Sequence, residues 1–356
     1  MSALTFTRRS VLGVSAALYA QQLKLPRQIR VAMIGLDGHP GEISGPLKRL
    51  PEVEIIAISD ATEEAFRRFT RGKPQMANAR RYDDFRGMLK AEKPDVVAVC
   101  NTNGQRAAGV IAAAERKFPV IAEKPLAASR AELNAVKKAV DGNGVPVGML
   151  LPMRYAPPYR ALKRIVESGD IGEVIQISSQ KSYKLGNRPE WFKKQETYGS
   201  TIIWIGVHMI DLMSWASGRK FAEAASFMGR VGFQGLGDME TTTATSFSLD
   251  NGGTATLHMD YCLPETATAH GDDRLRLSGT KGVAEYMAAT GVTVATASSK
   301  PARITELPAG GSVFVDFLDH VFNGKAASLT KQEIYAVCDA TVAAHESAVH
   351  HKMVRV

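Results

Sequence analysis

Cysteine is scarce in this sequence, and its spacing is unpaired. Cys100, Cys262 and Cys338 stand singly in apolar surroundings. A disulfide framework or a zinc motif requires cysteines or histidines at short, repeated intervals, and the chain has none of these around its cysteines. We therefore interpret all three as buried thiols.

Signatures of metal and hydrolase chemistry are also lacking. His345 and Glu346 begin like a metalloprotease helix, but Val349 stands where the second histidine is required. There is no G-x-S-x-G elbow and no cysteine-protease pattern. The sequence therefore predicts no metal site and no hydrolytic triad.

Aromatic residues make up only 7% of the chain, and its net charge of +8 is dispersed. Basic residues such as Arg67, Arg68 and Lys90 are spread along predicted helix faces. This pattern predicts a solvated surface, and we expect no nucleic-acid partner.

A long apolar run is missing as well, because the run from Val11 to Ala20 is too short for a permanent membrane helix. Arg8 and Arg9 come directly before it, within Thr-Arg-Arg-Ser-Val-Leu. This arrangement is typical of a twin-arginine export signal. We predict that residues 1–26 are such a signal, that the protein is periplasmic or secreted, and that it meets the membrane only during export. The alternative is a basic tail on a cytosolic protein.

The remainder has an ordinary globular composition, with 45% hydrophobic and 22% charged residues, and is long enough for two domains. Residues 27–150 alternate short apolar strands with helical segments, which predicts an α/β domain with a doubly wound parallel sheet. The predicted strands are Ile29 to Ile34, Glu54 to Ser59, Val96 to Cys100, the strand beginning at Val120, and Val145 to Gly148; the predicted helices are Asp83 to Ala91, Gln105 to Lys117 and Ser129 to Asp141.

The first strand continues into a glycine turn and then into helical sequence. Gly35, Gly38 and Gly41 follow a G-x-x-G-x-x-G spacing, with His39 beside the second and third glycines. Glycines allow the backbone to approach a pyrophosphate, and a helix N-terminus favours negative charge. We therefore predict that these four residues contact a dinucleotide.

Asp60 ends the next strand, roughly twenty residues beyond the turn. A carboxylate at this place accepts the ribose 2'-hydroxyl and repels a 2'-phosphate, so we predict NAD and not NADP. The alternative is an exposed aspartate at a helix cap, and the two roles are compatible.

Two further strands end in polar residues. Asn101 and Asn103 follow the strand from Val96, while Glu123 and Lys124 follow the strand from Val120 and precede a proline. Proline ends the strand and leaves the lysine at the carboxyl edge of the sheet, where ligands bind in open α/β folds. A surface loop with an ordinary Glu/Lys pair is the alternative.

Beyond residue 150 the pattern changes to long alternating stretches, which predict a large open, mostly antiparallel sheet in an α/β domain of residues 151–356. These stretches are Glu173 to Tyr183, Glu223 to Gly232, Thr241 to Leu249, Gly253 to Tyr261 and Arg274 to Ser278, and helices are expected at Pro158 to Ser168, Ile202 to Ala216, Val313 to Phe322 and Lys331 to Val349. We expect the last two helices to pack back on the first domain.

The helix Ile202 to Ala216 carries Trp204, His208 and Asp211 on one stripe. A buried histidine near a carboxylate is most often a structural core pair. Together with a lysine at a sheet edge, it also offers a proton path, because lysine and histidine are readily tuned near neutral pH.

These motifs resemble the glucose-fructose oxidoreductase, inositol dehydrogenase and rhizopine-catabolism (Gfo/Idh/MocA) family from Ile29 to Val356. The similarity lies in the strand and glycine turn, Asp60, Asn101 to Asn103, Glu123-Lys124-Pro125, Arg154-Tyr155-x-Pro157, Gly169 to Glu173, Gly206-x-His208-x-x-Asp211, Gly279 to Gly282 and Ser347 to Val356. The resemblance implies a Rossmann domain, an open sheet that often forms a dimer face, and hydride transfer between a nicotinamide and a sugar or polyol carbon.

By the same resemblance, Lys124 and His208 are the catalytic pair, and Arg154, Tyr183, Trp191, Trp204 and Asp211 are predicted to face the substrate. Three features depart from the family pattern. Trp204 stands where an aspartate is common, Asp37 disturbs the glycine turn, and Arg106 stands near the place of a frequent histidine.

The leading hypothesis is an exported NAD-dependent oxidoreductase acting on a carbohydrate, and we expect a homo-oligomer. A periplasm offers no pool that recycles NADH, so the cofactor is expected to stay bound and the overall reaction to be redox-neutral. Two alternatives remain: a glycosidase or lyase that oxidises its sugar transiently, and a non-catalytic sugar or dinucleotide sensor.

Overall fold

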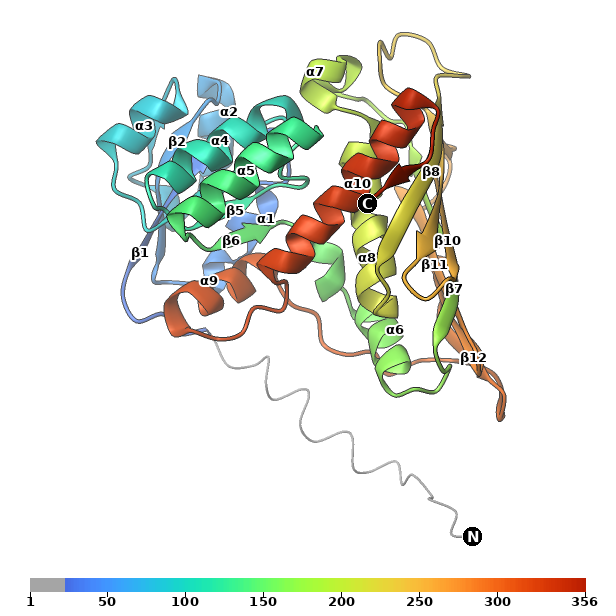
Figure 1. Cartoon of the computed structure of the whole chain (residues 1–356). Helices are drawn as coiled ribbons and strands as arrows, with labels where there is room; N and C mark the ends of the chain where they lie inside the picture. The colour runs from blue at the N-terminus through green and yellow to red at the C-terminus, as the bar shows by residue number, and fades with distance from the viewer. Residues whose placement is uncertain (1–22) are drawn as a thin grey trace.

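The computed structural model describes residues 23–356, so the predicted twin-arginine motif lies outside the described residues. Two layers of β-sheet stand apart, with helices between them (Figure 1). The first sheet has six strands in the order β3-β2-β1-β4-β5-β6, and every neighbouring pair is parallel. The doubly wound parallel sheet predicted for residues 27–150 is thus confirmed.

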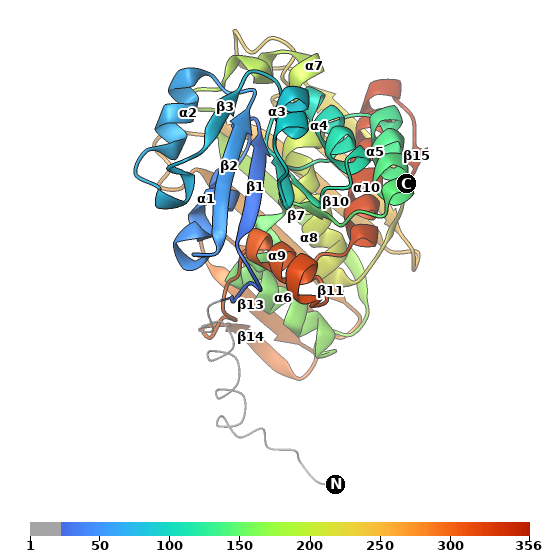
Figure 2. The same cartoon turned by 90° about the vertical axis from the view of Figure 1, so that its left-hand side faces the viewer.

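The first domain keeps to the predicted alternation of strands and helices (Figure 2). Its strands are β1 (Ile29–Ile34), β2 (Val53–Ser59), β3 (Arg80–Tyr82), β4 (Val96–Val99), β5 (Val120–Ala122) and β6 (Val147–Met149). Its helices are α1 (Gly41–Ser44), α2 (Glu63–Thr70), α3 (Phe85–Ala91), α4 (Asn103–Glu115) and α5 (Arg130–Asn143), with short 3₁₀ turns at Gly45–Arg49 and Pro74–Met76.

Apolar side chains on both faces of the first sheet explain its burial. One face packs against α3, α4 and α5, and the other packs against α1 and a late helix, α9 (Val313–Asn323). In α5, Leu133, Val136 and Val140 recur at intervals of three and four and are all buried, while Ser129 caps the helix by accepting a hydrogen bond from the Glu132 backbone N–H at 3.3 Å.

The second domain is built on a nine-stranded sheet in the order β14-β13-β12-β11-β7-β10-β9-β8-β15. Its pairs are antiparallel except for β7 and β10, so the sheet is mixed and mostly antiparallel. The strands are β7 (Val174–Lys184), β8 (Phe221–Gly229), β9 (Thr242–Leu249), β10 (Thr254–Leu263), β11 (Gly271–Gly279), β12 (Gly282–Met287), β13 (Gly291–Thr296), β14 (Ser299–Arg303) and β15 (Val354–Arg355).

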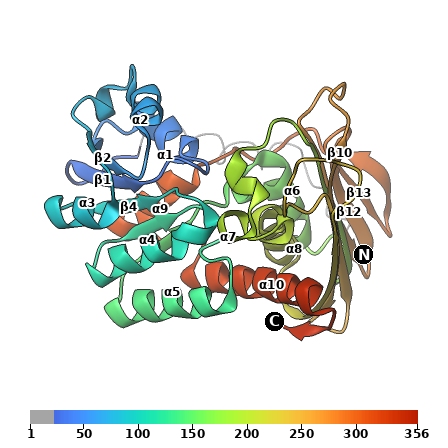
Figure 3. The ribbon, with the colours of Figure 1, turned by 90° about the horizontal axis from the view of Figure 1, so that it is seen from above.

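Helices cover only the inner face of this sheet, and the outer face is left open, as Figure 3 shows from above. The covering helices are α6 (Pro157–Glu167), α8 (Val207–Ser217) and α10 (Lys331–His350), and the connections add α7 (Gln195–Tyr198) and 3₁₀ turns at Pro152–Tyr155 and Glu190–Lys193. Helix α10 contacts β8, α8 and α5, so it joins both domains, whereas α9 packs on the first sheet. The prediction that the last two helices pack back on the first domain is therefore confirmed for α9 and only in part for α10.

Two sequence expectations need correction. The single helix expected from Ile202 to Ala216 begins as a π-helix over Ile202–Gly206 and becomes α-helical only from Val207. Cys262 is exposed, because it lies on the outward-facing side of the alternating strand β10, whereas Cys100 and Cys338 are buried as expected. Over the described residues, no helix is both long and apolar enough to cross a membrane.

Candidate active site

The carboxyl ends of β1, β4 and β5 meet at the centre of the first sheet. Gly35 has a φ of +73°, and a Cβ there would lie 2.6 Å from the Cα of Asn101, so glycine is required where these two strand ends touch. Asn101 Oδ1 and Thr102 Oγ1 are buried here without a hydrogen-bond partner. Buried polar atoms are normally paired, so these two mark the place of a polar ligand.

Lys124 projects from the end of β5 into the interior and is only 1% exposed. Its Nζ donates a hydrogen bond to the Trp204 backbone carbonyl at 2.6 Å and lies 3.1 Å from the centroid of the Trp204 ring. The π-helix contains this carbonyl, and such segments often occur at functional sites. Burial lowers the pKa of Lys124 well below its usual value, Arg106 and Lys181 add to this effect, and Glu123 opposes it.

Glu123 is fully buried beside Lys124 and binds the glycine turn. Its Oε2 accepts hydrogen bonds from the His39 backbone N–H at 2.7 Å and from His39 Nδ1 at 2.9 Å, while Oε1 lies 4.0 Å from Lys124 Nζ. Burial raises the pKa of Glu123, but His39, Lys124 and Arg106 outweigh it and lower the pKa to about 2. The carboxylate is therefore charged at neutral pH.

Arg106 is buried completely and holds two strand ends together. Its guanidinium donates to the Lys124 carbonyl at 2.9 Å, the Pro125 carbonyl at 3.1 Å, Asn103 Oδ1 at 2.6 Å and the Asn101 carbonyl. Burial lowers the pKa of Arg106 to about 10, which still leaves it charged at neutral pH. Arg106 thus fixes the backbone of Lys124.

Trp204 covers this group from the second domain and is 7% exposed. Its ring stacks on the imidazole of His39, with centroids 5.4 Å apart and an angle of 13°, and Trp191 packs edge-on against it at 5.2 Å. The predicted residue Trp204 therefore reaches the strand ends, where its indole lies over the Lys124 ammonium, and the predicted residue Trp191 contacts Trp204.

His208 lies one helical turn beyond Trp204, and its ring is 6.5 Å from that of His39. Its Nδ1 is buried and has no hydrogen-bond partner. Burial lowers the pKa of His208 well below 6.5, and the positive charges of Lys124, Lys181 and His39 add to this effect. The imidazole is therefore neutral.

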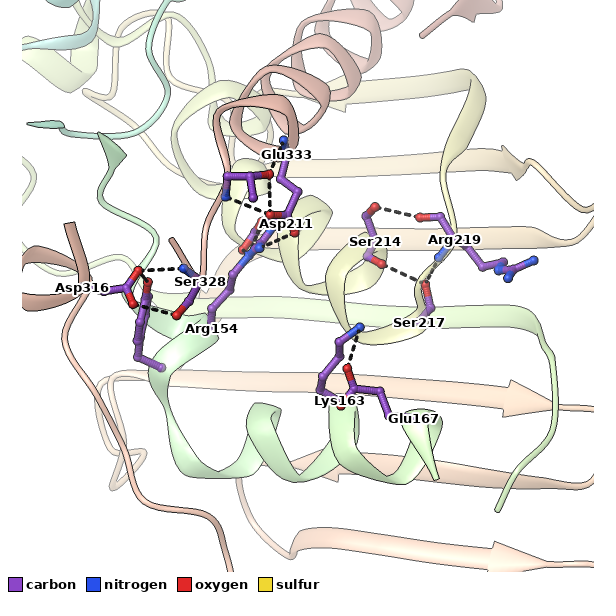
Figure 4. Close-up of polar contacts among 12 residues, drawn as sticks. Arg154, Lys163, Glu167, Asp211, Ser214, Ser217, Arg219, Asp316, Ser328 and Glu333 are labelled. Carbon is purple, nitrogen blue, oxygen red and sulfur yellow. Dashed lines mark hydrogen bonds and ion pairs between the residues drawn. The ribbon is translucent and has the colours of Figure 1, made fainter. Parts of the chain in front are cut away.

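Asp211 does not pair with His208, contrary to the expected core pair. Arg154 Nε donates to both oxygens of Asp211 at 2.9 Å, Nη2 donates to Oδ1 at 2.6 Å, and Nη1 donates to Glu333 on α10 at 2.8 Å (Figure 4). This buried pair joins α8, the turn before α6 and α10. Arg154 and Asp211 remain predicted substrate residues, but the contacts of the described chain give them a structural role.

Lys181 and Asp273 belong to the inner face of the second sheet and were missed at the sequence level. Lys181 is 2% exposed, and its Nζ donates to Asp273 Oδ2 at 2.8 Å, while Asp273 Oδ1 is buried without a partner. Burial lowers the pKa of Lys181, but Tyr183 and Asp273 outweigh it and raise the pKa. The sequence signal that could have identified this pair is the position of Lys181, a lysine at an inward-facing place of the alternating strand β7. The predicted residue Tyr183 adjoins this pair, its ring centroid 5.0 Å from Lys181 Nζ.

Lys181 also lies close to the α8 side of the site. On the same face of β7, Ser179 Oγ lies 3.0 Å from Met213 Sδ on α8. Lys181 is two residues further along, and its cross-strand partner Met259 packs against Gly206. The pair Lys181 and Asp273 therefore faces the N-terminal turn of α8, where His208 lies.

The residues around the first strand ends fit a dinucleotide. Asp60 follows β2, is exposed, and has a φ of 55°, while Thr62 is the cap of α2, accepting from the Ala65 N–H at 3.2 Å. Thr62, and not Asp60, is therefore the cap of α2. The exposed Asp60 carboxylate faces the Phe85 backbone N–H at the start of α3 and lies where a ribose hydroxyl is expected. A Cβ at Gly41 would meet nothing within 4 Å, which leaves open space at the turn. Asn101 Oδ1 and Thr102 Oγ1, which are buried without a partner at the end of β4, add two polar atoms to this dinucleotide site.

Such a sheet with ligand groups at its carboxyl edge, joined to a second mixed-sheet domain, is typical of two-domain dinucleotide-binding proteins. Residues 29–150 match the model of the oxidoreductase family with an NAD-binding Rossmann fold, and residues 159–285 match the model of the Gfo/Idh/MocA C-terminal domain. The chain therefore carries both domains of the Gfo/Idh/MocA oxidoreductase family, and its cofactor is NAD.

Relatives and solved structures support this assignment. An uncharacterized oxidoreductase of Bacillus subtilis is 26% identical over 270 residues, which is 73% of this chain and 74% of that protein. Inositol 2-dehydrogenase of Salmonella typhimurium is 28% identical over 196 residues, 52% of each chain, so this match spans about half of the relative. A structure from Thermotoga maritima, described as an oxidoreductase, superposes with a TM-score of 0.85 at 29% identity over 92% of this chain and 100% of that chain. Levoglucosan dehydrogenase in complex with NADH shares the fold, with a TM-score of 0.77 at 20% identity over 92% and 99%.

Proposed function

We propose that the protein is an exported NAD-dependent dehydrogenase that acts on a hydroxyl-bearing carbon of a sugar or polyol. The observation that carries the proposal is the meeting of Lys124, from the first sheet, with the turn that bears His208, from the second domain. Named relatives support the substrate class, among them the inositol 2-dehydrogenase and the D-glucoside 3-dehydrogenase of Escherichia coli, which is 27% identical over 170 residues.

The residues of this chain would bind and orient the reacting alcohol. NAD, when bound, supplies the hydride acceptor. Lys124 and His208 hold the hydroxyl group, since one offers N–H donors and the other an unpartnered ring nitrogen. Asp273 Oδ1 and Lys181 offer an acceptor and a donor to neighbouring hydroxyls, which suits a vicinal diol. Trp204 and Trp191 close the site against water.

We further propose that NAD stays bound and that the overall reaction is redox-neutral. Two contacts join the domains beside the strand ends: Asn103 Nδ2 donates to the Tyr198 carbonyl at 2.6 Å, and Gly104 lies against the Glu196 carbonyl. These contacts oppose release of a ligand from between the domains. Two coupled sugar reactions, or oxidation, elimination and re-reduction that cleave a glycoside, both regenerate the starting cofactor.

The test begins with mass spectrometry of small molecules released from the denatured protein, where we expect NAD. Lys124→Met and His208→Ala should each lower turnover on the sugar found by about a hundredfold or more while bound NAD stays near its normal amount. No bound or binding NAD, or turnover independent of both residues, would refute the proposal. Export is checked separately, by fractionating cells that carry Arg8 and Arg9 replaced by lysine.

A further inference from the structure

His39 combines three features that no other ionisable side chain of the candidate site shares. Its imidazole lies at the site, stacked on Trp204 and edge-on to His208. Its side chain is 52% exposed, so it also reaches solvent. A carboxylate holds one of its ring nitrogens. A general base requires this combination of access to the substrate, access to water and a fixed orientation.

Glu123 fixes the orientation of the His39 ring. One carboxylate oxygen binds both the backbone N–H of His39 and its Nδ1, at 2.7 and 2.9 Å. A charged carboxylate is only an acceptor, so Nδ1 must carry the proton and Nε2 must present its lone pair. The same relation between a carboxylate, a histidine and a reacting hydroxyl recurs in nucleophile-activating sites on unrelated folds.

The other two candidates are less suited to accept and release a proton. His208 is 8% exposed, and its buried Nδ1 lacks a partner that would stabilise an imidazolium. Lys124 is 1% exposed and uses one N–H on the Trp204 carbonyl beneath the indole ring. Both can hold a hydroxyl group, but both are far less exposed to solvent than His39.

We propose that His39 is the general base of the reaction and that Glu123 is the residue that positions it. This inference rests on the proposed dehydrogenase function. During oxidation of the alcohol, the C–H bond breaks and its electron pair leaves with the hydride to NAD; the hydroxyl proton passes to His39 Nε2, and the carbon–oxygen bond becomes a carbonyl. His39 then releases the proton to solvent through its exposed side.

Titratable groups face His39 from several elements. Glu123 faces it from β5, Glu42 faces it from α1, and Lys124 and His208 lie on the opposite side. Burial lowers the pKa of both Lys124 and His208. Protonated His39 cannot accept a proton, so turnover should fall on the acidic side.

The experiment compares His39→Gln with His320→Gln, a histidine of α9 outside the site whose Nδ1 bonds the Lys325 carbonyl. We expect His39→Gln, measured at saturating NAD, to lower turnover by about a hundredfold or more and to abolish the acidic limb of the pH profile. The control should keep wild-type turnover. Added imidazole should restore part of the activity of His39→Gln.

A second readout is independent of turnover. Nitrogen NMR of the imidazole rings, with the His39 signal assigned from its loss in His39→Gln, should show the proton on Nδ1 in the wild type and a mixture of tautomers in Glu123→Gln. If the wild-type His39 ring carries its proton on Nε2, or if Glu123→Gln leaves the tautomer unchanged, Glu123 does not position His39 and the proposal is wrong.

The turnover outcomes separate this inference from the function on which it rests. His39→Gln with normal turnover, alongside inactive Lys124→Met, would leave the dehydrogenase standing and reject His39 as the base. Loss of NAD binding with full turnover at saturating NAD would make His39 a cofactor contact only.

Discussion

The guanidinium of Arg106 satisfies backbone carbonyls that belong to the ends of both β4 and β5. Replacing it leaves these carbonyls buried without donors, and each such loss costs about 1–3 kcal/mol. We predict that Arg106→Met lowers the free energy of unfolding by about 3 kcal/mol or more, as measured by urea denaturation.

Arg116→Met at the C-cap of the same helix is the matched control, because Arg116 is exposed and its guanidinium donates to the Ala112 carbonyl of that helix. It should stay within about 0.5 kcal/mol of wild type. An equal loss of unfolding free energy in the two variants would show that the buried hydrogen bonds of Arg106 do not hold the strand ends.

The ion pair of Arg154 with Asp211 predicts a specific pH dependence. Burial already raises the pKa of Asp211, with Arg154 opposing, so Arg154→Met should raise it further. A carboxyl whose folded pKa lies above its unfolded value binds more protons when folded, so stability falls as pH rises through this range. Denaturation curves should therefore show that the free energy of unfolding of Arg154→Met is about 3–5 kcal/mol below that of the wild type at neutral pH. This difference should shrink towards about pH 4.

The exposed pair Arg276 and Glu285 provides the comparison. Arg276→Met should cost at most about 1 kcal/mol, since exposed ion pairs contribute little. A deficit for Arg154→Met that grew on acidification would contradict the assignment of Asp211 as the group responsible.

Sequence patterns predicted single residues at strand ends well and their partners poorly. Lys124 and Asn101 could be placed at the sheet edge because apolar strands and a proline define where those strands end. The pairing of Asp211 with Arg154 could not be read, since the two residues are 57 positions apart and His208 was nearer in sequence. Separation in sequence does not show which residues of the turn before α6 and of α8 come into contact in the fold.

At the scale of elements, the junction between α4 and the segment before the π-helix is unusually close. A Cβ at Gly104 would lie 1.8 Å from the Glu196 carbonyl oxygen. We predict that Gly104→Ala moves this segment away, lowers stability by about 1–3 kcal/mol and speeds the exchange of bound NAD for labelled NAD.

Gly142→Ala tests whether helix propensity alone explains the result. Gly142 also lies in a helix, α5, but nothing lies within 4 Å of its added Cβ. This variant should be stabilised by up to about 1 kcal/mol and keep normal NAD exchange. Normal exchange in Gly104→Ala as well would rule out the junction as a barrier to release.

The elements themselves could be predicted to different degrees. β1 was placed at both ends, Ile29 and Ile34, because a buried parallel strand is a continuous apolar run between polar residues. Strands β12, β13 and β14 were missed, because they lie toward one edge of the second sheet and β14 is exposed throughout. Without a buried face, a strand has no hydrophobic alternation to detect.

At the scale of the whole molecule, the uncovered face of the nine-stranded sheet predicts association of two copies. Thr254, Thr256 and His258 of β10 are exposed there, although they lie in the middle of the sheet. We predict a homo-oligomer in solution and expect Thr256→Arg to reduce the mass by light scattering to that of one chain, 38.4 kDa.

Arg116→Glu at the C-cap of the distant helix α4 changes charge without touching this face and should leave the mass unchanged. A monomeric wild-type protein, or an oligomer unaffected by Thr256→Arg, would place any interface elsewhere.

The burial of Lys124 beneath the Trp204 ring has a consequence for the reactivity of its amine. A lowered pKa gives Lys124 a larger share of the unprotonated, nucleophilic amine than a surface lysine has. The indole of Trp204 blocks the approach of any reagent while it covers the ammonium. The rate at which an acylating reagent labels Lys124 should therefore report how often the two domains part, and a sugar or NAD that holds them together should suppress that labelling before any turnover is measured.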